Sequence, residues 1–243
     1  MPVTNSTEDS RKFHPSQPRI HLIQQCIDDG IFDEIGKAIM DDKLINKEVH
    51  ISGSNTTRIV CNATDACNKV PLNEWAIHRQ ICRGFVMEIY TDPNTHISIF
   101  KPINMPLCKF GSTHSCGQQI PSDDAKGWVS FKHDGTSIIM TSSEPELLIN
   151  TRATMKQNIL QIKLTKKLLE ENNDDNILNK FPNGTTFCAE LIHPDDPKKI
   201  LCRGESRLVI LQITKPTGEI VPPDKFQDML KSTSSIIDYI KYS

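Results

Sequence analysis

The sequence predicts an α+β protein with an antiparallel-sheet core from about residue 46 to residue 220, preceded by a small helical lobe. Two observations support this. Short apolar runs rich in β-branched residues are separated by Gly, Asn and Asp turns, and helical spacing is confined to an early segment and one later segment. No repeat or linker divides the chain, so we expect a flexible leader over residues 1–17 and one domain over 18–243.

The N-terminal part of that domain is predicted to be helical. Apolar residues recur at helical spacing from Ile20 to Ile39 and are interrupted near Gly30, which indicates two short amphipathic helices. The preceding leader is rich in Ser, Thr and Pro, a composition typical of flexible chain. Apolar residues between 49 and 61, separated by Gly and Asn, then indicate a hairpin.

The middle of the chain is predicted to contain further strands. The run 82–90 has strand character and is opened by Arg83-Gly84, and 96–101 suits a paired strand. A Pro-containing loop leads on to Lys109-Phe110. Two short apolar runs follow, which suit paired strands: 128–131 and 137–140.

The second half alternates strands and helices. Strands are expected at 144–150, 185–192 and 207–213. The segment 151–154, Thr-Arg-Ala-Thr, is predicted to open a helix by Thr capping. Apolar residues spaced by Lys and Glu predict a helix over residues 155–171. Residues 222–243 suit a polar helix.

Charge restricts how the chain could bind a polyanion. With 28 basic and 30 acidic residues the formal net charge is −2, whereas proteins that bind nucleic acid by bulk charge are usually basic. Any nucleic-acid surface must therefore be local. Lys163, Lys166 and Lys167 are one candidate cluster, although a solvated helix face explains them more simply.

The lack of a membrane span or signal peptide, together with the spacing of the cysteines, predicts a reducing compartment. No apolar run reaches the roughly 18 residues of a membrane span, and the N-terminus lacks a signal-peptide core. We therefore expect a cytoplasmic or nuclear protein that is not secreted, with no membrane association and eight reduced cysteines. Cys108, His114 and Cys116 are too few for a structural zinc site.

The segment 132–136, Lys-His-Asp-Gly-Thr, carries the most suggestive chemistry. It lies between two short apolar runs, so a lysine amine stands at a turn. Such an amine is a nucleophile when its pKa is lowered, Asp134 could bind a metal or accept a proton, and Gly135 lets a phosphate approach the backbone. Asp-Gly is also a common hairpin turn, which is the simpler explanation of the same residues.

Glu190 is an unusual acid because it lies inside the apolar strand 185–192. A carboxylate in such a run is costly unless it is paired or bound to a metal. Glu190 is therefore a better functional candidate than most acids of this chain.

Taken in order, these features resemble the covalent nucleotidyltransferase superfamily, and most closely the phage RNA ligase 1 family. The resemblance covers roughly residues 65–225 and rests on Arg-Gly, Lys-Phe, the Lys-x-Asp-Gly motif, a basic residue after the next strand and Phe-x-x-Glu. It implies an antiparallel-sheet nucleotidyltransferase domain of the ATP-grasp-like, ligase adenylation type. It also implies an ATP-dependent RNA ligase that joins RNA 5′-phosphate and 3′-hydroxyl ends.

Carried across residue by residue, the resemblance implies a role for each motif. Lys132 would become covalently linked to AMP. Arg83 and Lys109 would contact the ATP phosphates or the leaving pyrophosphate, and Arg152 stands where the family has a lysine. Glu190 would hold the ribose or help to organise a metal.

The remaining implied contacts involve the turn of the motif and a divalent ion. Gly135 would lie against the nucleotide, and Asp134 with Glu190 would hold Mg²⁺, or Mn²⁺ in its place. Asp134 and Glu190 would thus join Lys132 as the catalytic residues.

The sequence departs from the family after residue 213. The expected Glu-Gly of motif IV and Lys-x-Lys of motif V are not recognisable, and the residues 238–241 are not a convincing substitute. A chain cut short, a partner chain that brings the missing segment, and a diverged binding module all explain this. The alternatives are thus a catalytically impaired or non-catalytic nucleotide- or RNA-binding protein, and a DNA ligase or capping-type enzyme.

Overall fold

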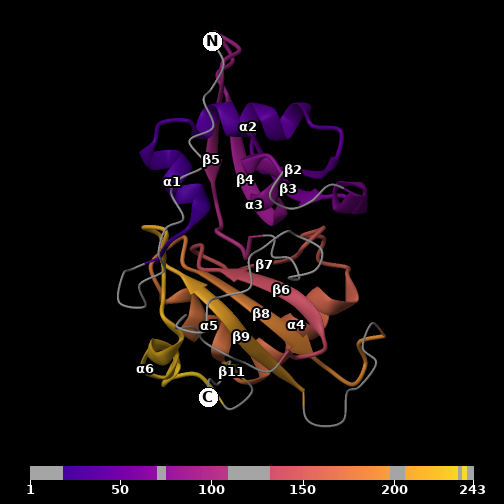
Figure 1. The fold of residues 1–243 in the computed structure, drawn as a ribbon. Coiled ribbons are helices and arrows are strands. Elements are labelled where there is room, and N and C mark those ends of the chain that lie inside the picture. The colour runs from indigo at the N-terminus through magenta and orange to yellow at the C-terminus, as the bar shows by residue number, and fades with distance from the viewer. Residues whose placement is uncertain (1–18, 70–74, 109–131, 198–205, 235–236, 240–243) are drawn as a thin grey trace, which may run out of the picture.

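The computed structural model describes residues 19–69, 75–108, 132–197, 206–234 and 237–239. Two mainly antiparallel sheets lie one above the other, each with helices against one face (Figure 1). Within the described residues, the N-terminal sheet has the order β2-β3-β4-β5, and the C-terminal sheet has the order β1-β10-β9-β8-β6-β7 with β11 also paired to β9. The α+β class and the antiparallel core are confirmed, but the core is divided between two sheets.

The N-terminal sheet follows two helices as the spacing of apolar residues predicted. Helices α1 (Leu22–Asp28) and α2 (Phe32–Asp41) are separated at Gly30, whose φ is 70°. The strands are β2 (Ile45–Ile51), β3 (Thr56–Ala63), β4 (Arg83–Thr91) and β5 (Ser98–Pro102), with the short helices η1 (Asp65–Lys69) and α3 (Ile77–Ile81) between β3 and β4. The helices form no separate lobe, because they share one apolar core with this sheet.

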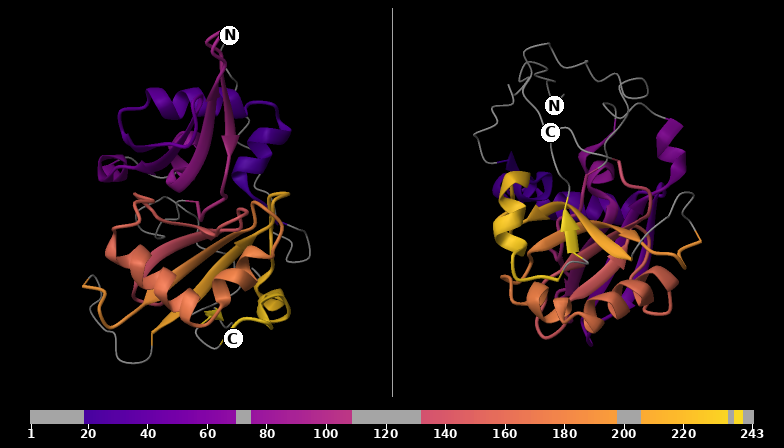
Figure 2. Two further views of the ribbon diagram at one scale, coloured as in Figure 1. Left: turned by 180° about the vertical axis from the view of Figure 1, so that it is seen from behind. Right: turned by 90° about the horizontal axis from the view of Figure 1, so that it is seen from below.

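The C-terminal sheet is built from later strands and its own helices. Its elements are β1 (Arg19–Ile20), β6 (Thr136–Thr141), β7 (Leu148–Thr151), α4 (Leu160–Glu171), α5 (Asp174–Asn179), β8 (Thr186–Ile192), β9 (Arg207–Thr214), β10 (Glu219–Ile220), η3 (Pro223–Lys225), α6 (Phe226–Leu230) and β11 (Ile237–Tyr239). Seen from behind, α4 and α5 cross one face of this sheet (Figure 2). Ile138, Phe187 and Leu169 belong to the core beneath them.

The other face of β6, β7 and β8 meets the start of β4. Gly84 has a φ of 80°, and a Cβ there would lie 2.4 Å from Ile139 Cδ1. Its carbonyl oxygen accepts hydrogen bonds of 3.0 Å from the side-chain amides of both Asn104 and Asn150. Both asparagines are fully buried, so the two sheets are joined by satisfied polar contacts rather than by apolar packing alone.

The prediction for residues 144–171 is partly wrong. The strand begins only at Leu148, after a turn at Glu144 and Pro145, and the helix begins at Leu160 instead of residue 155. Thr151 does not cap that helix, because its hydroxyl accepts the backbone N–H groups of Ala153 and Thr154 at 3.3 Å. Threonine hydroxyls bind nearby backbone N–H groups both in helix caps and in turns, and Thr151 does so in a turn.

The predicted polar helix over 222–243 is also wrong. Only α6 is an α-helix in its described part, and Ile237 to Tyr239 form β11 in parallel register with Leu208 to Ile210 of β9. Ile237 is buried in the core of the C-terminal sheet. A long-range partner therefore overrides the local pattern.

Several other expectations concern composition. The cysteines within the described residues are free, five of them buried and Cys108 partly so, as predicted. No described helix has both the length and the apolarity that a membrane crossing needs. Lys163 and Lys167 are exposed on α4, as a solvated helix face requires. The predicted leader, the strand 128–131, His114 and Cys116 lie outside the described residues.

His21 connects the start of α1 to the segment after β5. Its Nδ1 accepts the backbone N–H of Ile23 at 3.1 Å, and its Nε2 lies 2.7 Å from the carbonyl oxygen of Pro106. These partners require a neutral imidazole that donates from Nε2. Because the side chain is buried, its pKa is lowered from 6.5 to about 4.

We expect His21 to make stability fall in mild acid. The unfolded chain binds a proton near the ordinary pKa of 6.5, whereas the folded chain resists protonation until about pH 4. About 3 kcal/mol of unfolding free energy should be lost between these values. Denaturant unfolding from pH 7 to pH 4 should show a shallower pH dependence for His21→Asn than for the wild type. His96→Asn, at an exposed histidine, should keep the wild-type slope, and parallel curves for all three proteins would contradict the assignment.

Candidate functional site

The segment from Lys132 to Gly135 leads directly into β6, beside β8. The antiparallel register places Ser137 opposite Glu190, and the backbone N–H of Gly135 donates a hydrogen bond of 3.1 Å to Glu190 Oε1. Lys132 is exposed, whereas Asp134 and Glu190 are partly buried. Two predicted motifs 55 positions apart in the sequence are thus in direct contact.

Gly135 is required here for space. A Cβ at this position would lie 2.2 Å from the carbonyl oxygen of Leu191 and 3.0 Å from Glu190 Cγ, and neither distance is sterically tolerable without movement of the chain. The sequence suggested that this glycine lets a phosphate approach the backbone. In the structure, the group that approaches it is β8, so Gly135 fixes how closely the Lys132 segment lies against Glu190.

The carboxyl group of Glu190 has an unusual electrostatic environment. Burial raises its pKa, and the nearby acids Asp134 and Asp196 raise it further. The N–H of Gly135 and the ammonium group of Lys132 lower it but do not outweigh the burial. Lys132, Asp134 and Glu190 therefore lie close together, and their predicted catalytic use stays a prediction.

Asp196 is an acid of this site that sequence reasoning missed. It is 1% exposed and accepts hydrogen bonds from Thr136 Oγ1 at 2.5 Å and from Gln161 Nε2 at 3.0 Å. In the sequence it stands in a Pro-Asp-Asp-Pro turn, where an aspartate is expected to be solvated. Its burial depends on α4 and β6, which local sequence does not reveal.

The sheet register places Glu190, Cys188 and Asn150 on one face of the C-terminal sheet. Ile139, which pairs with Asn150 and Cys188, lies two residues after Ser137, so these positions share one face with Ser137 and Glu190. That face is the one that meets Gly84 of β4.

Arg83 and Arg152 come together at this junction. Arg83 opens β4, and Arg152 follows the last residue of β7, so they belong to different sheets. A Cβ on Gly84, the residue after Arg83, would lie 3.0 Å from the Cα of Arg152, so the backbones at the two arginines are close. Burial lowers the pKa of the Arg83 guanidinium, and the positive charge of Arg152 lowers it further. Such a pair of cations is suited to an anion with several charges.

Cys108, the last described residue before Lys109, lies near Arg83. Burial raises the pKa of the Cys108 thiol to about 11, and the neighbouring Arg83 opposes this rise. Cys188 of β8 is fully buried beside them, and its pKa is raised to about 12 by burial. Lys109 itself lies outside the described residues, so its predicted place in the site stays a prediction.

A second pair near the motif lysine was also missed. Burial lowers the pKa of His133, and Arg207 lowers it while Asp238 raises it, so this pair lies near the residue next to Lys132. Arg207 and Asp238 are 3.9 Å apart, on β9 and β11. Sequence reasoning considered Asp238 only as part of residues 238–241, which do not match motif V, and assigned it no role.

The site offers an amine, several acids and two guanidinium groups. No group of three His, Cys, Asp or Glu side chains in the described part of the chain is arranged to hold a metal ion alone. The nearby carboxylates of Asp134 and Glu190 are hard oxygen ligands of the type that Mg²⁺ binds, and Mg²⁺ is commonly held by one or two such groups together with phosphate oxygens. The residues therefore fit a magnesium-bound nucleotide better than a free metal ion.

Comparison with known proteins leaves the function open. No protein-family model and no curated protein sequence matches this chain. Among solved structures, the chain aligns with the Naegleria gruberi RNA ligase with PPi over 83% of each chain, with 8% sequence identity and a TM-score of 0.40. A superposition this loose identifies neither a fold family nor an activity, so the site has to be interpreted from its own residues.

We expect Gly135→Ala to be destabilising. The new methyl group must push the Lys132 segment away from Leu191, which should lower the unfolding free energy by about 1–3 kcal/mol. Urea unfolding measures this change. Gly53→Ala is the matched control, since a Cβ there meets only Thr56 atoms at 3.7 Å and beyond. Equal stability of the two variants would show that Gly135 and Leu191 are not in close contact.

Proposed function

We propose that this chain is an ATP-dependent RNA ligase that acts through a lysyl-AMP intermediate on Lys132. The observation that supports the proposal is that Lys132, Asp134 and Gly135 lie close to Glu190. Lys132 lies near Glu190 on the neighbouring strand, and the junction of the two sheets holds Arg83 and Arg152. A lysine nucleophile, carboxylates for a metal ion and cations for the leaving pyrophosphate are the groups that nucleotidyl transfer requires.

In the first step, the neutral Lys132 amine attacks the α-phosphorus of ATP. A P–N bond forms, the P–O bond to pyrophosphate breaks in line, and the proton leaves the amine for Asp134 or water. The guanidinium groups of Arg83 and Arg152, together with Lys109, would neutralise the charge that accumulates on pyrophosphate. Their role is positioning and charge stabilisation, which supply most of the rate in such transfers.

Glu190 would orient the nucleotide. The N–H of Gly135 binds one carboxylate oxygen, and the other oxygen would accept a hydrogen bond from a ribose hydroxyl or bind a magnesium ion. Magnesium, when bound through Asp134 and Glu190, would supply positive charge to the triphosphate. Manganese has the same oxygen preference.

The later steps pass the activated group to RNA. The adenylate moves from Lys132 to an RNA 5′-phosphate, and a 3′-hydroxyl then displaces AMP to form a phosphodiester. DNA nicks and RNA caps are alternative substrates for the same lysine chemistry. The residues 238–241 do not supply a motif V pattern, which favours as a second candidate a protein that binds nucleotide or RNA without catalysis.

We expect Lys132→Ala to abolish covalent labelling. Incubation with α-labelled ATP and magnesium, followed by denaturing electrophoresis and peptide mapping, should place one AMP on Lys132 of the wild type. Lys163→Ala, at an exposed lysine of α4, should label normally. A Lys132→Ala protein that still carries AMP would refute the proposal, and ATP binding without any adduct would favour the non-catalytic candidate.

We expect Glu190→Gln to separate activity from stability. Loss of the charge should slow adduct formation by about 10²–10³. Because burial raises the pKa of this carboxyl group, removing its charge should leave the thermal midpoint unchanged or higher. Single-turnover labelling and thermal unfolding measure the two effects, with Glu170→Gln on the exposed side of α4 as the control. A lower thermal midpoint with normal labelling would assign Glu190 a structural role.

A further inference from the structure

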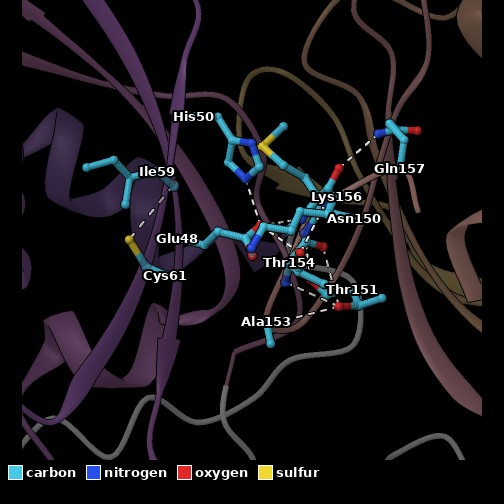
Figure 3. Close-up of polar contacts among 11 residues, drawn as sticks. Glu48, His50, Ile59, Cys61, Asn150, Thr151, Ala153, Thr154, Lys156 and Gln157 are labelled. Atoms are coloured by element: carbon cyan, nitrogen blue, oxygen red, sulfur yellow. Dashed lines mark hydrogen bonds and ion pairs between the residues drawn. The ribbon is translucent and has the colours of Figure 1, made fainter. Parts of the chain in front are cut away.

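Glu48 of β2 makes a polar connection to the segment that carries Arg152. Its Oε1 accepts hydrogen bonds from Thr154 Oγ1 at 2.6 Å and from the backbone N–H of Met155 at 3.1 Å (Figure 3). These partners are more than 100 residues away in sequence and belong to the C-terminal half. The contact is therefore a tertiary one between the two sheets.

The same carboxylate has two further partners. His50 Nε2 lies 2.6 Å from Oε1, and Lys156 Nζ lies 3.4 Å from Oε2. Burial alone would raise the pKa of Glu48, but hydrogen bonds from Thr154, His50 and Met155 outweigh it and the pKa is lowered. Glu48 is thus ionised at neutral pH, and its hydrogen bonds are the stronger, charge-assisted kind.

The connected segment is a tight turn around Arg152. The backbone N–H of Thr151 donates to the carbonyl oxygen of Thr154 at 2.9 Å, and the Thr151 hydroxyl accepts from Ala153 and Thr154. Arg152 is exposed and lies inside this turn. Its backbone is fixed, therefore, by residues on both sides of it.

Each end of the turn is held by a different strand of the N-terminal sheet. Before Arg152, the amide of Asn150 donates to the Gly84 carbonyl oxygen of β4 at 3.0 Å. After it, Thr154 binds Glu48 of β2, and Met155 packs in a small apolar cluster with Val60 and Val86. Because the turn is attached at two points, to Gly84 and to Glu48, it cannot rotate about either one alone.

This double attachment opposes a repulsion. The backbone of Arg152 adjoins Gly84, the residue after Arg83, because a Cβ on Gly84 would lie 3.0 Å from the Arg152 Cα. The charge of Arg152 also lowers the pKa of Arg83, so the two cations repel each other when no anion lies between them. An arginine side chain also loses conformational freedom when it is held in place. A fixed backbone keeps the guanidinium group near Arg83 despite both effects.

We propose that Glu48 is a positioning residue that holds Arg152 beside Arg83 for the triphosphate of ATP. The inference rests on the proposed function, because Arg152 acts only if the site binds that triphosphate. Glu48 touches no reacting atom. It acts through the turn.

Hydrogen exchange tests the connection itself. In Glu48→Ala the Met155 amide loses its acceptor, so its exchange rate should rise at least tenfold while amides of the β8–β9 ladder exchange as before. Glu88→Gln is the matched control, because Glu88 lies on the same sheet and pairs with Arg58 at 3.1 Å without contact to the turn. An unchanged Met155 amide would overturn the inference.

A double-mutant cycle tests the positioning role. ATP affinity and single-turnover labelling are measured for Glu48→Ala, for Arg152→Ala and for the double variant. We expect Glu48→Ala to weaken ATP binding about tenfold alone and to have no further effect when Arg152→Ala is present, because both act through one group. Glu48→Gln keeps an acceptor oxygen and should recover part of the affinity. It also replaces Glu48→Ala if the latter does not fold.

The outcomes separate this inference from the ligase proposal. Equal losses from Glu48→Ala in both backgrounds, with a wild type that labels Lys132, would overturn the positioning role and leave the ligase intact. A wild type that binds ATP without labelling would refute the ligase, and the cycle in ATP affinity would still decide the role of Glu48. A wild type without ATP affinity would overturn both.

Discussion

The carbonyl oxygen of Gly84 is the acceptor on which the junction of the two sheets depends. Asn104 and Asn150 both donate to it, and Asn104 also accepts the backbone N–H of Val86 at 2.7 Å. Each such bond contributes about 1 kcal/mol, but a buried amide left without its partner costs about 1–3 kcal/mol. The main effect of these bonds is therefore to disfavour other arrangements of the two sheets, in which the buried amides would lose their partners.

The same junction makes room for the basic residues. Gly84 has no side chain, so β4 can approach within contact distance of Ile139 and of the backbone at Thr151. Arg83 and Arg152, the residues adjoining this contact, are consequently brought together from opposite sheets. The candidate anion site thus depends on the close approach of the backbone at Gly84 to the backbone at Thr151 and Arg152.

Strand register decides which side chains face that junction. Glu190 and Ser137 are paired, and a slip by one residue would turn Glu190 into the apolar core under α4. The β8–β9 register shifts between Cys188 and Ala189, one residue before Glu190. Bulges of this kind re-aim side chains near functional sites, and here the shift lies next to the one acid of an otherwise apolar strand.

The sequence by itself determined the α+β class, most strands and the paired N-terminal helices, because these depend on local periodicity. It also made Lys132 a candidate through the Lys-x-Asp-Gly motif and Glu190 a candidate through the cost of a carboxylate in an apolar strand. Only the tertiary structure decided the turn at Thr151, the strand β11, the burial of Asp196 and the connection made by Glu48. Each of these depends on a partner far away in the sequence, such as β9 for Ile237 or Thr154 for Glu48. Local patterns contain no information about such partners, so the arrangement of the site was fixed by packing between the sheets.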